Sequence, residues 1–229
     1  MTMAPRRTPA QSRAEESTSL TALPSFGLAS EKNMSATGFR RRDDIVRRAA
    51  ELFEERGYYQ TSMDDIAEAV GIAKPTLYHY FTGKDAILWR IHNEFLQVLL
   101  DGQEQRRTGS VIEDPAGELR QMMHDLLGLI GARPGYARAF FELHREIPAE
   151  WYSQIDEQRA RYERSLEDVV RAGVKRGQFR KVDVESTTKA VAGMCNWTYH
   201  WFKNADPAPD VDKLVDYFFS LITDGIGAR

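Results

Sequence analysis

The side chains with the clearest chemical potential gather between residues 74 and 80 of this 229-residue chain. These side chains are Lys74, Thr76, Tyr78, His79 and Tyr80. They supply ammonium, hydroxyl and imidazole groups within about two turns of a helix. Such groups suit phosphate oxygens and base edges, which accept hydrogen bonds from them. The alternative is that Tyr78 and Tyr80 pack their rings against the core with the hydroxyls at its rim. We expect Thr76 and Tyr78 to contact nucleic acid, and both interpretations stay open for Tyr80.

A second group of cationic side chains lies in the C-terminal half and consists of Arg138, Arg145, Arg159, Arg161 and Arg164. Arginine binds phosphate through two parallel hydrogen bonds, so this group suits a ligand with a phosphorylated head group. Pairing with neighbouring acids on a helix surface, such as Glu157 and Glu163, is the alternative for several of them.

The remaining reactive residues give little support for enzyme or metal chemistry. The histidines at positions 79, 92, 124, 144 and 200 show no metal-ligand spacing with one another or with a carboxylate. Cys195 is the single cysteine, and neither a glycine-rich phosphate loop nor a Gly-x-Ser-x-Gly sequence occurs. We therefore predict no enzyme activity, no cofactor and no metal, with a helical enzyme as a remote alternative. His92 and His144 are candidates for lining a ligand pocket.

Two short helices joined by a turn are expected to position the first group. Apolar residues recur at helical spacing and predict a helix over residues 63–70, capped by Thr61 or Ser62. Gly71 ends this helix with a left-handed residue, and Pro75 suits the first turn of a second helix. A helix, a glycine-containing turn and a helix make a helix-turn-helix, whose second helix enters the DNA major groove.

Residues 61–84 read Thr-Ser-Met-Asp-Asp-Ile-Ala-Glu-Ala-Val-Gly-Ile-Ala-Lys-Pro-Thr-Leu-Tyr-His-Tyr-Phe-Thr-Gly-Lys. This stretch resembles the DNA-binding domain of TetR-family transcriptional regulators, whose hallmark is a glycine turn followed by Leu-Tyr-x-Tyr/His-Phe-x-x-Lys. The resemblance implies DNA contacts at Ser62, Lys74, Thr76, Tyr78, His79 and Lys84. Position 74 is often a small polar residue in the family, so the base preferences of other members do not carry over to Lys74.

The charge distribution agrees with local rather than general binding of DNA. A net charge of −3 argues against nonspecific coating of nucleic acid, but it leaves room for a localised basic face. The cationic residues cluster at Arg40, Arg41 and Arg42 and again at Lys74 and Lys84. Arg40 and Arg41 therefore belong to the predicted DNA-binding set, which also includes Pro75 and Tyr80. The expected partner is a palindromic operator.

The composition is that of a globular protein from a reducing compartment. Apolar residues make up 42% and charged residues 28% of the chain, which are ordinary proportions. No apolar run approaches the roughly 20 residues that a membrane span needs, and the N-terminus lacks the apolar segment of a secretory signal. One cysteine cannot form a disulfide framework. We predict a bacterial cytoplasmic protein associated with the nucleoid, without a membrane partner.

Residues 1–37 are rich in serine, threonine, proline and charge and have no periodic apolar pattern, which predicts a disordered arm. Arg6, Arg7 and Arg13 could instead touch DNA phosphates, although a solvated tail is the favoured interpretation. Translation that begins at Met34 is a further alternative, because most of the arm would then not be made.

Helical patterns in the rest of the chain predict an all-α, TetR-like fold with two domains. Residues 38–84 form the DNA-binding domain, whose first helix covers residues 40–56, and residues 85–229 form the effector-binding and dimerisation domain. A long helix over residues 84–101 is shared by both cores. Further helices are predicted over residues 115–131, 136–145, 149–176, 185–202 and 211–226.

The second domain holds more aromatic and methionine side chains than a tight core of its size requires, which suits an adaptable apolar pocket. Ordinary packing is the alternative for part of them. The predicted effector-binding set is Trp89, Phe95, Leu99, Met123, Phe141, Trp151, Tyr152, Arg159, Arg161, Arg164, Trp197 and Trp201.

The run that contains Trp197, Trp201 and Phe202 is similar to that of TetR-family regulators that respond to acyl-CoA thioesters in fatty-acid or sterol breakdown. We therefore predict a repressor of a catabolic operon that a hydrophobic effector, such as an acyl-CoA thioester, releases from DNA. An uncharged lipophile or drug as the effector is the alternative.

The last two predicted helices carry apolar residues on opposite faces, which indicates a subunit interface in addition to a core. In the helix over residues 185–202, one stripe is Val191, Cys195, Thr198 and Phe202, and the other is Ala190, Met194, Trp197 and Trp201. The predicted dimerisation set is Val191, Cys195, Thr198, Phe202, Val215, Phe218, Phe219 and Ile222. The resemblance to the TetR family implies a four-helix bundle between two copies, and hence a homodimer.

Overall fold

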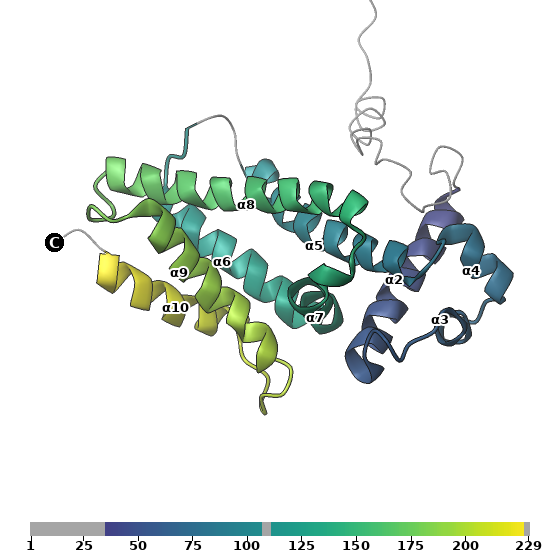
Figure 1. Ribbon diagram of the computed structural model, residues 1–229. Coiled ribbons are helices and arrows are strands. Elements are labelled where there is room, and N and C mark those ends of the chain that lie inside the picture. The colour runs from purple at the N-terminus through teal and green to yellow at the C-terminus, as the bar shows by residue number, and fades with distance from the viewer. Residues whose placement is uncertain (1–34, 107–110, 227–229) are drawn as a thin grey trace, which may run out of the picture.

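The computed structural model describes residues 35–106 and 111–226, and every regular element in these ranges is a helix (Figure 1). The α-helices are α2 (Ala36–Arg56), α3 (Met63–Val70), α4 (Lys74–Tyr80), α5 (Lys84–Arg106), α6 (Pro115–Ala132), α7 (Pro134–Glu142), α8 (Ala149–Lys175), α9 (Val184–Asn196) and α10 (Val211–Ile226). Two short 3₁₀ helices, η2 (His144–Glu146) and η3 (Trp197–His200), follow α7 and α9. The predicted all-α class is confirmed.

The first helix begins earlier than the sequence pattern predicts. Ser35 is its N-cap, because the Ser35 side chain accepts a hydrogen bond of 3.2 Å from the Gly38 amide. Residues 36 and 37 therefore belong to α2 rather than to the predicted arm, while residues 1–34, which carry the rest of that prediction, lie outside the described residues. The predicted helix over residues 185–202 is also divided: α9 ends at Asn196, and the chain continues as a 3₁₀ turn.

Helices α2, α3 and α4 form a compact head at one end of the molecule (Figure 1). A capping box starts α3: the Asp65 amide donates to the Ser62 hydroxyl at 3.1 Å, and the Ser62 amide donates to the Asp65 carboxylate at 2.7 Å. Gly71 ends α3 with a φ of +70°, a conformation that costs other residues steric strain. The turn then directs α4 across α3, as the helix-turn-helix interpretation requires.

Helix α5 joins the head to the body and is buried around most of its circumference. Eight consecutive residues, 86–93, are buried, so this part of the helix has no solvent-facing side. Its start packs on α2, and its remaining length packs on α6, α7 and α8. A single hydrophobic core consequently runs from the head into the body.

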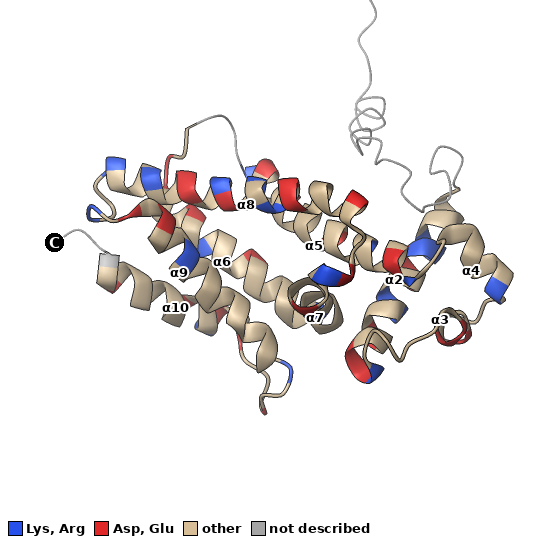
Figure 2. Ribbon diagram, viewed as in Figure 1, with Lys and Arg blue, Asp and Glu red and all other residues tan. Residues whose placement is uncertain are grey.

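In the body, α5 packs on α6, α7 and α8, α9 packs on α6 and α8, and α10 packs on α6 at the outer edge (Figure 1). Acidic and basic residues are interspersed along α8, whereas the ribbon of α10 is mostly without charge (Figure 2). Within residues 35–106 and 111–226, none of the helices combines the length and the apolar character that crossing a membrane would require.

Helix α7 brings the backbone of the body close to that of the head. Gly135, in the first turn of α7, lies so near α2 that a Cβ atom there would be 2.7 Å from the Ala50 carbonyl oxygen. Because that oxygen belongs to a helix backbone, it cannot move aside as a flexible side chain would. The absence of a side chain at position 135 thus sets the spacing of the two helices.

Replacing this glycine tests the importance of that spacing. Gly135→Ala is expected to lower the free energy of unfolding by about 1–3 kcal/mol, because α7 must move away from α2. Gly128→Ala in α6 is the matched control, since a Cβ there meets nothing within 4 Å and alanine favours the helix by up to about 1 kcal/mol. Urea denaturation measures both variants. Equal effects of the two substitutions would contradict the tight contact.

Candidate nucleic-acid interface and effector pocket

Helix α4 presents its polar residues to solvent and is held from behind by two apolar anchors. Leu77 and Phe81 are fully buried, as their i, i+4 spacing predicts. The exposed residues of the helix are Lys74, Pro75, Thr76, Tyr78 and His79. The Tyr78 side chain is 46% exposed, which leaves its hydroxyl available to a partner.

The other predicted DNA contacts differ in how freely they face solvent. Tyr80 is half-buried and packs against the core, so of the two interpretations left open for it the structure favours packing. Arg40 and Arg41 are exposed on the first turns of α2. The Ser62 hydroxyl is exposed at the start of α3, although it already serves as the helix cap.

Both lysines of the predicted set already have a partner within the head. The Lys74 ammonium lies 2.8 Å from an Asp64 carboxylate oxygen, and this hydrogen bond raises the Lys74 pKa. The Lys84 ammonium donates to the Tyr58 carbonyl at 2.7 Å and lies 4.5 Å from the centre of the Tyr58 ring. Burial lowers the pKa of Lys84. Lys84 thus fastens the start of α5 to the connection after α2, in addition to any contact with phosphate.

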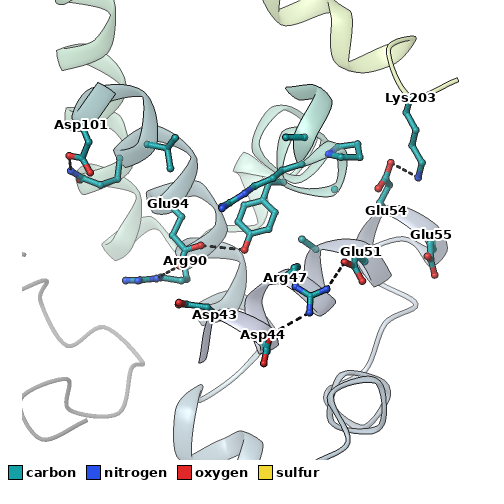
Figure 3. Close-up of a pocket in the computed structure, with 18 residues that line it drawn as sticks. Asp43, Asp44, Arg47, Glu51, Glu54, Glu55, Arg90, Glu94, Asp101 and Lys203 are labelled. Atoms are coloured by element: carbon teal, nitrogen blue, oxygen red, sulfur yellow. Dashed lines mark hydrogen bonds and ion pairs between the residues drawn. The ribbon is translucent and has the colours of Figure 1, made fainter. Parts of the chain in front are cut away.

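A cleft of about 680 Å³ separates the head from the body, and Figure 3 shows the charged side chains that surround it. Helix α2 supplies most of its carboxylates, and Glu94 on α5 accepts from the Arg90 guanidinium at 2.6 Å and from the Tyr136 hydroxyl at 3.3 Å. Lys203 spans from the α9–α10 connection to Glu54 on α2 at 2.9 Å. The acidic lining makes this cleft a poor site for an anionic effector.

A second cavity, of about 190 Å³, lies in the body between α5, α6, α7, α8 and α9. Its walls are mostly apolar and aromatic, and four members of the predicted effector-binding set line it: Phe95, Leu99, Phe141 and Arg159. His144, predicted as a pocket candidate, lines it as well. The cavity thus brings together part of the predicted set at one place.

Several residues that line the cavity do not belong to the predicted effector-binding set. Helix α8 contributes Tyr162, Glu163 and Leu166 next to Arg159, and α9 contributes Ala192 and Asn196. The signal was present, because residues 159, 162, 163 and 166 share one face of a helix at spacings of three and four. A prediction based on aromatic and cationic residues does not include small or polar lining residues such as Ala192 and Asn196.

Several predicted effector residues lie outside this cavity. Trp89 and Met123 are closed within the core, at most 2% exposed. Trp151 and Tyr152 are half-buried near the start of α8 and do not line the cavity. Arg161 and Arg164 are exposed on the outer side of α8, where Arg161 pairs with Glu104.

Trp197 and Trp201, which also belong to the predicted effector-binding set, do not line this cavity. Trp197 is 62% exposed and Trp201 is 36% exposed, so both face away from the core. The reason is that the opposite stripe of α9 and η3 fills the body instead. Val191, Cys195, Thr198 and Phe202 are at most 8% exposed.

Most of the predicted dimerisation residues do not lie on the surface of the protomer. Val191, Cys195, Thr198, Phe202 and Val215 are buried inside their own protomer and offer no surface to a second copy. Phe218, Phe219 and Ile222 are half-buried, because α10 packs them toward α6. Among the large apolar side chains that are exposed in the described residues, four lie in or next to η3 and α10, and we define them as the aromatic face: Trp197, Trp201, Tyr217 and Leu221. The two stripes are equally apolar in sequence, so spacing alone could not tell which of them faces the core.

His92 is fully buried beside the cavity and is neutral. Its Nε2 lies 3.1 Å from the Ala139 carbonyl oxygen, which can only accept, so Nε2 carries the proton. Burial, followed by the charge of Arg159, lowers the His92 pKa to about 3. Within the part of the chain that the structure describes, no three or more histidine, cysteine or carboxylate side chains gather in a way that could hold a metal ion.

A helix-turn-helix head coupled through a shared helix to a helical body with an internal cavity defines a DNA-binding regulatory protein rather than an enzyme. Comparison with known proteins agrees. The family model described as "Bacterial regulatory proteins, tetR family" matches residues 45–91, and "Tetracyclin repressor-like, C-terminal domain" matches residues 113–226. The chain belongs to the TetR family of transcriptional regulators.

Individual relatives match over most of their length. The HTH-type transcriptional repressor KstR2 of Rhodococcus jostii (strain RHA1) is 25% identical over 197 residues, which are 82% of this chain and 92% of KstR2. The solved TetR-family regulator PfmR from Thermus thermophilus is 31% identical with a TM-score of 0.72, covering 78% of this chain and 96% of PfmR. AibR, solved with isovaleryl coenzyme A and operator DNA, is 26% identical with a TM-score of 0.67, and the match covers 79% of this chain and 97% of AibR.

The buried neutral histidine predicts a loss of stability in mild acid. The folded-state pKa of about 3 lies below the ordinary value of 6.5, so the unfolded chain gains a proton first as the pH falls through 6.5. Between pH 7 and pH 5 the free energy of unfolding should decrease by about 2 kcal/mol from this residue. His92→Gln should remove that part of the decrease, whereas the exposed His79→Gln should not. Urea unfolding at the two pH values measures it, and identical pH dependence in His92→Gln and wild type would refute the assignment.

Proposed function

We propose that the protein is a repressor that binds a near-palindromic operator as a homodimer and is released by a hydrophobic effector. The observation that carries this proposal is α4, which holds Thr76, Tyr78 and His79 exposed on a helix anchored by two buried residues. A rigid helix with several donors on its outer side suits the major groove, where base edges accept hydrogen bonds. We expect it to act in the bacterial cytoplasm, on the promoter of a catabolic operon.

The aromatic face supports the dimer part of the proposal. Trp197 and Tyr217 are both more than 60% exposed, and large aromatic side chains are enriched where protein surfaces pair. A second copy that covers this face would build a four-helix interface from α9 and α10 of each protomer. Two-fold symmetry then places two copies of α4 on half-sites about one helical turn of DNA apart, which explains the palindromic operator.

The internal cavity supports control by a small molecule. At about 190 Å³ it lies below the roughly 300–1,000 Å³ typical of sites for drug-sized ligands. A complete coenzyme A thioester does not fit, so an acyl-CoA effector would place its acyl group in the cavity and its nucleotide outside. The relative AibR was solved with isovaleryl coenzyme A, whose acyl group is of this size class. An uncharged lipophile is the second candidate, favoured by the apolar walls.

Helix α7 supplies a route from the cavity to the head. Its last turn places Phe140 and Phe141 in the cavity wall, and its first turn places Gly135 against the backbone of α2. An effector moves the head only if it binds one head position more tightly than the other. A hundredfold difference corresponds to about 2.7 kcal/mol, and operator DNA must then weaken effector binding by the same factor.

Operator binding tests the assignment of α4. Tyr78→Ala is expected to weaken specific binding at least tenfold, and Lys74→Ala should reduce the salt dependence of binding by about one counterion per subunit. Lys189→Ala is the matched control, because Lys189 is exposed and paired with Glu185 on α9, far along the chain from α4. Fluorescence anisotropy at several salt concentrations, with a scrambled duplex alongside, gives both values. Operator binding unchanged in folded Tyr78→Ala and Lys74→Ala would exclude this helix from the groove.

Charge placed on the aromatic face tests the dimer. Trp197→Glu combined with Tyr217→Glu should yield folded monomers that bind the operator at least a hundredfold more weakly, because a monomer contacts only one half-site whereas the dimer contacts both. Val98→Glu is the control, because Val98 is an apolar residue 46% exposed on α5 and outside the aromatic face. Sedimentation velocity at micromolar concentration measures the assembly state. A monomeric wild type, or a double variant that stays dimeric, would contradict the proposal.

A further inference from the structure

We propose that the body cavity selects a small acyl compound, about the size of one ring or a short branched chain, and that Arg159 binds its acyl oxygen. This inference rests on the proposed function, because it names the class of effector and the residue that recognises it. The shared chemistry is a carbonyl or carboxylate oxygen on a compact apolar body. Its two possible sources are a free acid and a coenzyme A thioester.

The size limit follows from the cavity itself. Its volume of about 190 Å³ is close to the roughly 150 Å³ of an engineered apolar cavity that holds one benzene molecule. The walls around the interior are Phe95, Leu99, Leu126 and Leu166, which exclude water and offer no hydrogen bond from their side chains. A long acyl chain or a fused ring system would have to displace these side chains, and closely packed side chains resist such displacement.

The position of Arg159 explains why an oxygen should be recognised. Its guanidinium carbon lies 5.0 Å from the centre of the Phe140 ring, so the cation is held against one wall of the cavity. Among the described residues it forms no ion pair, and its buried Nε–H has no hydrogen-bond acceptor. On the same helix, by contrast, Arg161 pairs with Glu104 and Arg171 pairs with Asp168.

The lining of the cavity offers Arg159 little negative charge. His144 lines the same cavity, and His92 behind it stays neutral, partly because of the charge on Arg159. The single carboxylate among the lining residues is Glu163, which is exposed at the opening. A half-buried cation next to apolar walls gains most from a ligand oxygen that completes its hydrogen bonds. A hydrocarbon of the same shape would leave it unsatisfied.

Binding of three matched probes tests this inference. Benzoate, benzoyl-CoA and toluene share one ring, but toluene lacks the acyl oxygen. Isothermal titration of the full-length dimer should show that benzoate or benzoyl-CoA binds at least tenfold more tightly than toluene, which is about 1.4 kcal/mol. In Arg159→Gln the tighter acyl probe should lose this advantage while toluene changes by less than twofold. Arg161→Gln, on the outer side of α8, should behave as wild type.

The outcomes separate the sources and the proposals. Tighter binding of benzoyl-CoA identifies a thioester, and tighter binding of benzoate identifies a free acid. Toluene binding as tightly as both acyl probes, no binding of either acyl probe at millimolar concentration, or an unchanged acyl preference in Arg159→Gln would overturn the inference. Circular dichroism and operator binding report folding, and Arg159→Lys, which keeps the charge, is expected to retain part of the preference if Arg159→Gln does not fold. Failure of the wild type to bind any operator would instead count against the proposed function.

Discussion

Burial of the first half of α5, where residues 86–93 have no solvent-facing side, is the constraint on which the rest of the structure depends. A head of three helices, from Ala36 to Tyr80, is too small to bury much apolar surface by itself. It gains a core by packing on the start of α5, while the remaining length of α5 forms the centre of the body. Because Trp89 and its neighbours have no solvent-facing side, α5 cannot shift at one end without repacking at the other. Head and body are therefore parts of one mechanical unit.

Because head and body share one core, α7 can link the cavity to the head. The helix is only nine residues long, yet it touches the α2 backbone at Gly135 and the cavity at Phe140 and Phe141. The contact with α2 at Gly135 and the cavity wall at Phe140 and Phe141 thus lie less than three helical turns apart along α7. Tight packing converts small displacements into discrete rearrangements. Such geometry suits a regulator in which a small molecule alters the position of the DNA-reading helix.

The head was predictable in detail because its signals are local. Caps, the left-handed glycine and the i, i+4 anchors act within a few residues of chain. Spacing therefore predicts the helix end at Gly71 and the anchors Leu77 and Phe81, and it narrows the cap to Thr61 or Ser62, of which the structure uses Ser62. The body was predictable only as a series of helices. Some helices of the body end at other residues than the sequence pattern predicts. Near the end of α9, for example, the Thr198 hydroxyl donates a hydrogen bond to the Cys195 carbonyl, and the chain continues as a 3₁₀ turn.

The amino-acid sequence by itself determined the all-helical class, the helix-turn-helix and the presence of two apolar stripes along α9. Only the tertiary structure decided which stripe is core, because hydrophobic periodicity states that a face avoids water but does not name what covers it. Val191 and Phe202 therefore turned out to be internal, and Trp197 external. The same holds for the arginines of α8. Arg159 and Arg161 look alike in sequence, but two residues of separation turn them toward nearly opposite sides of the helix, which puts the first on a cavity and the second in solvent.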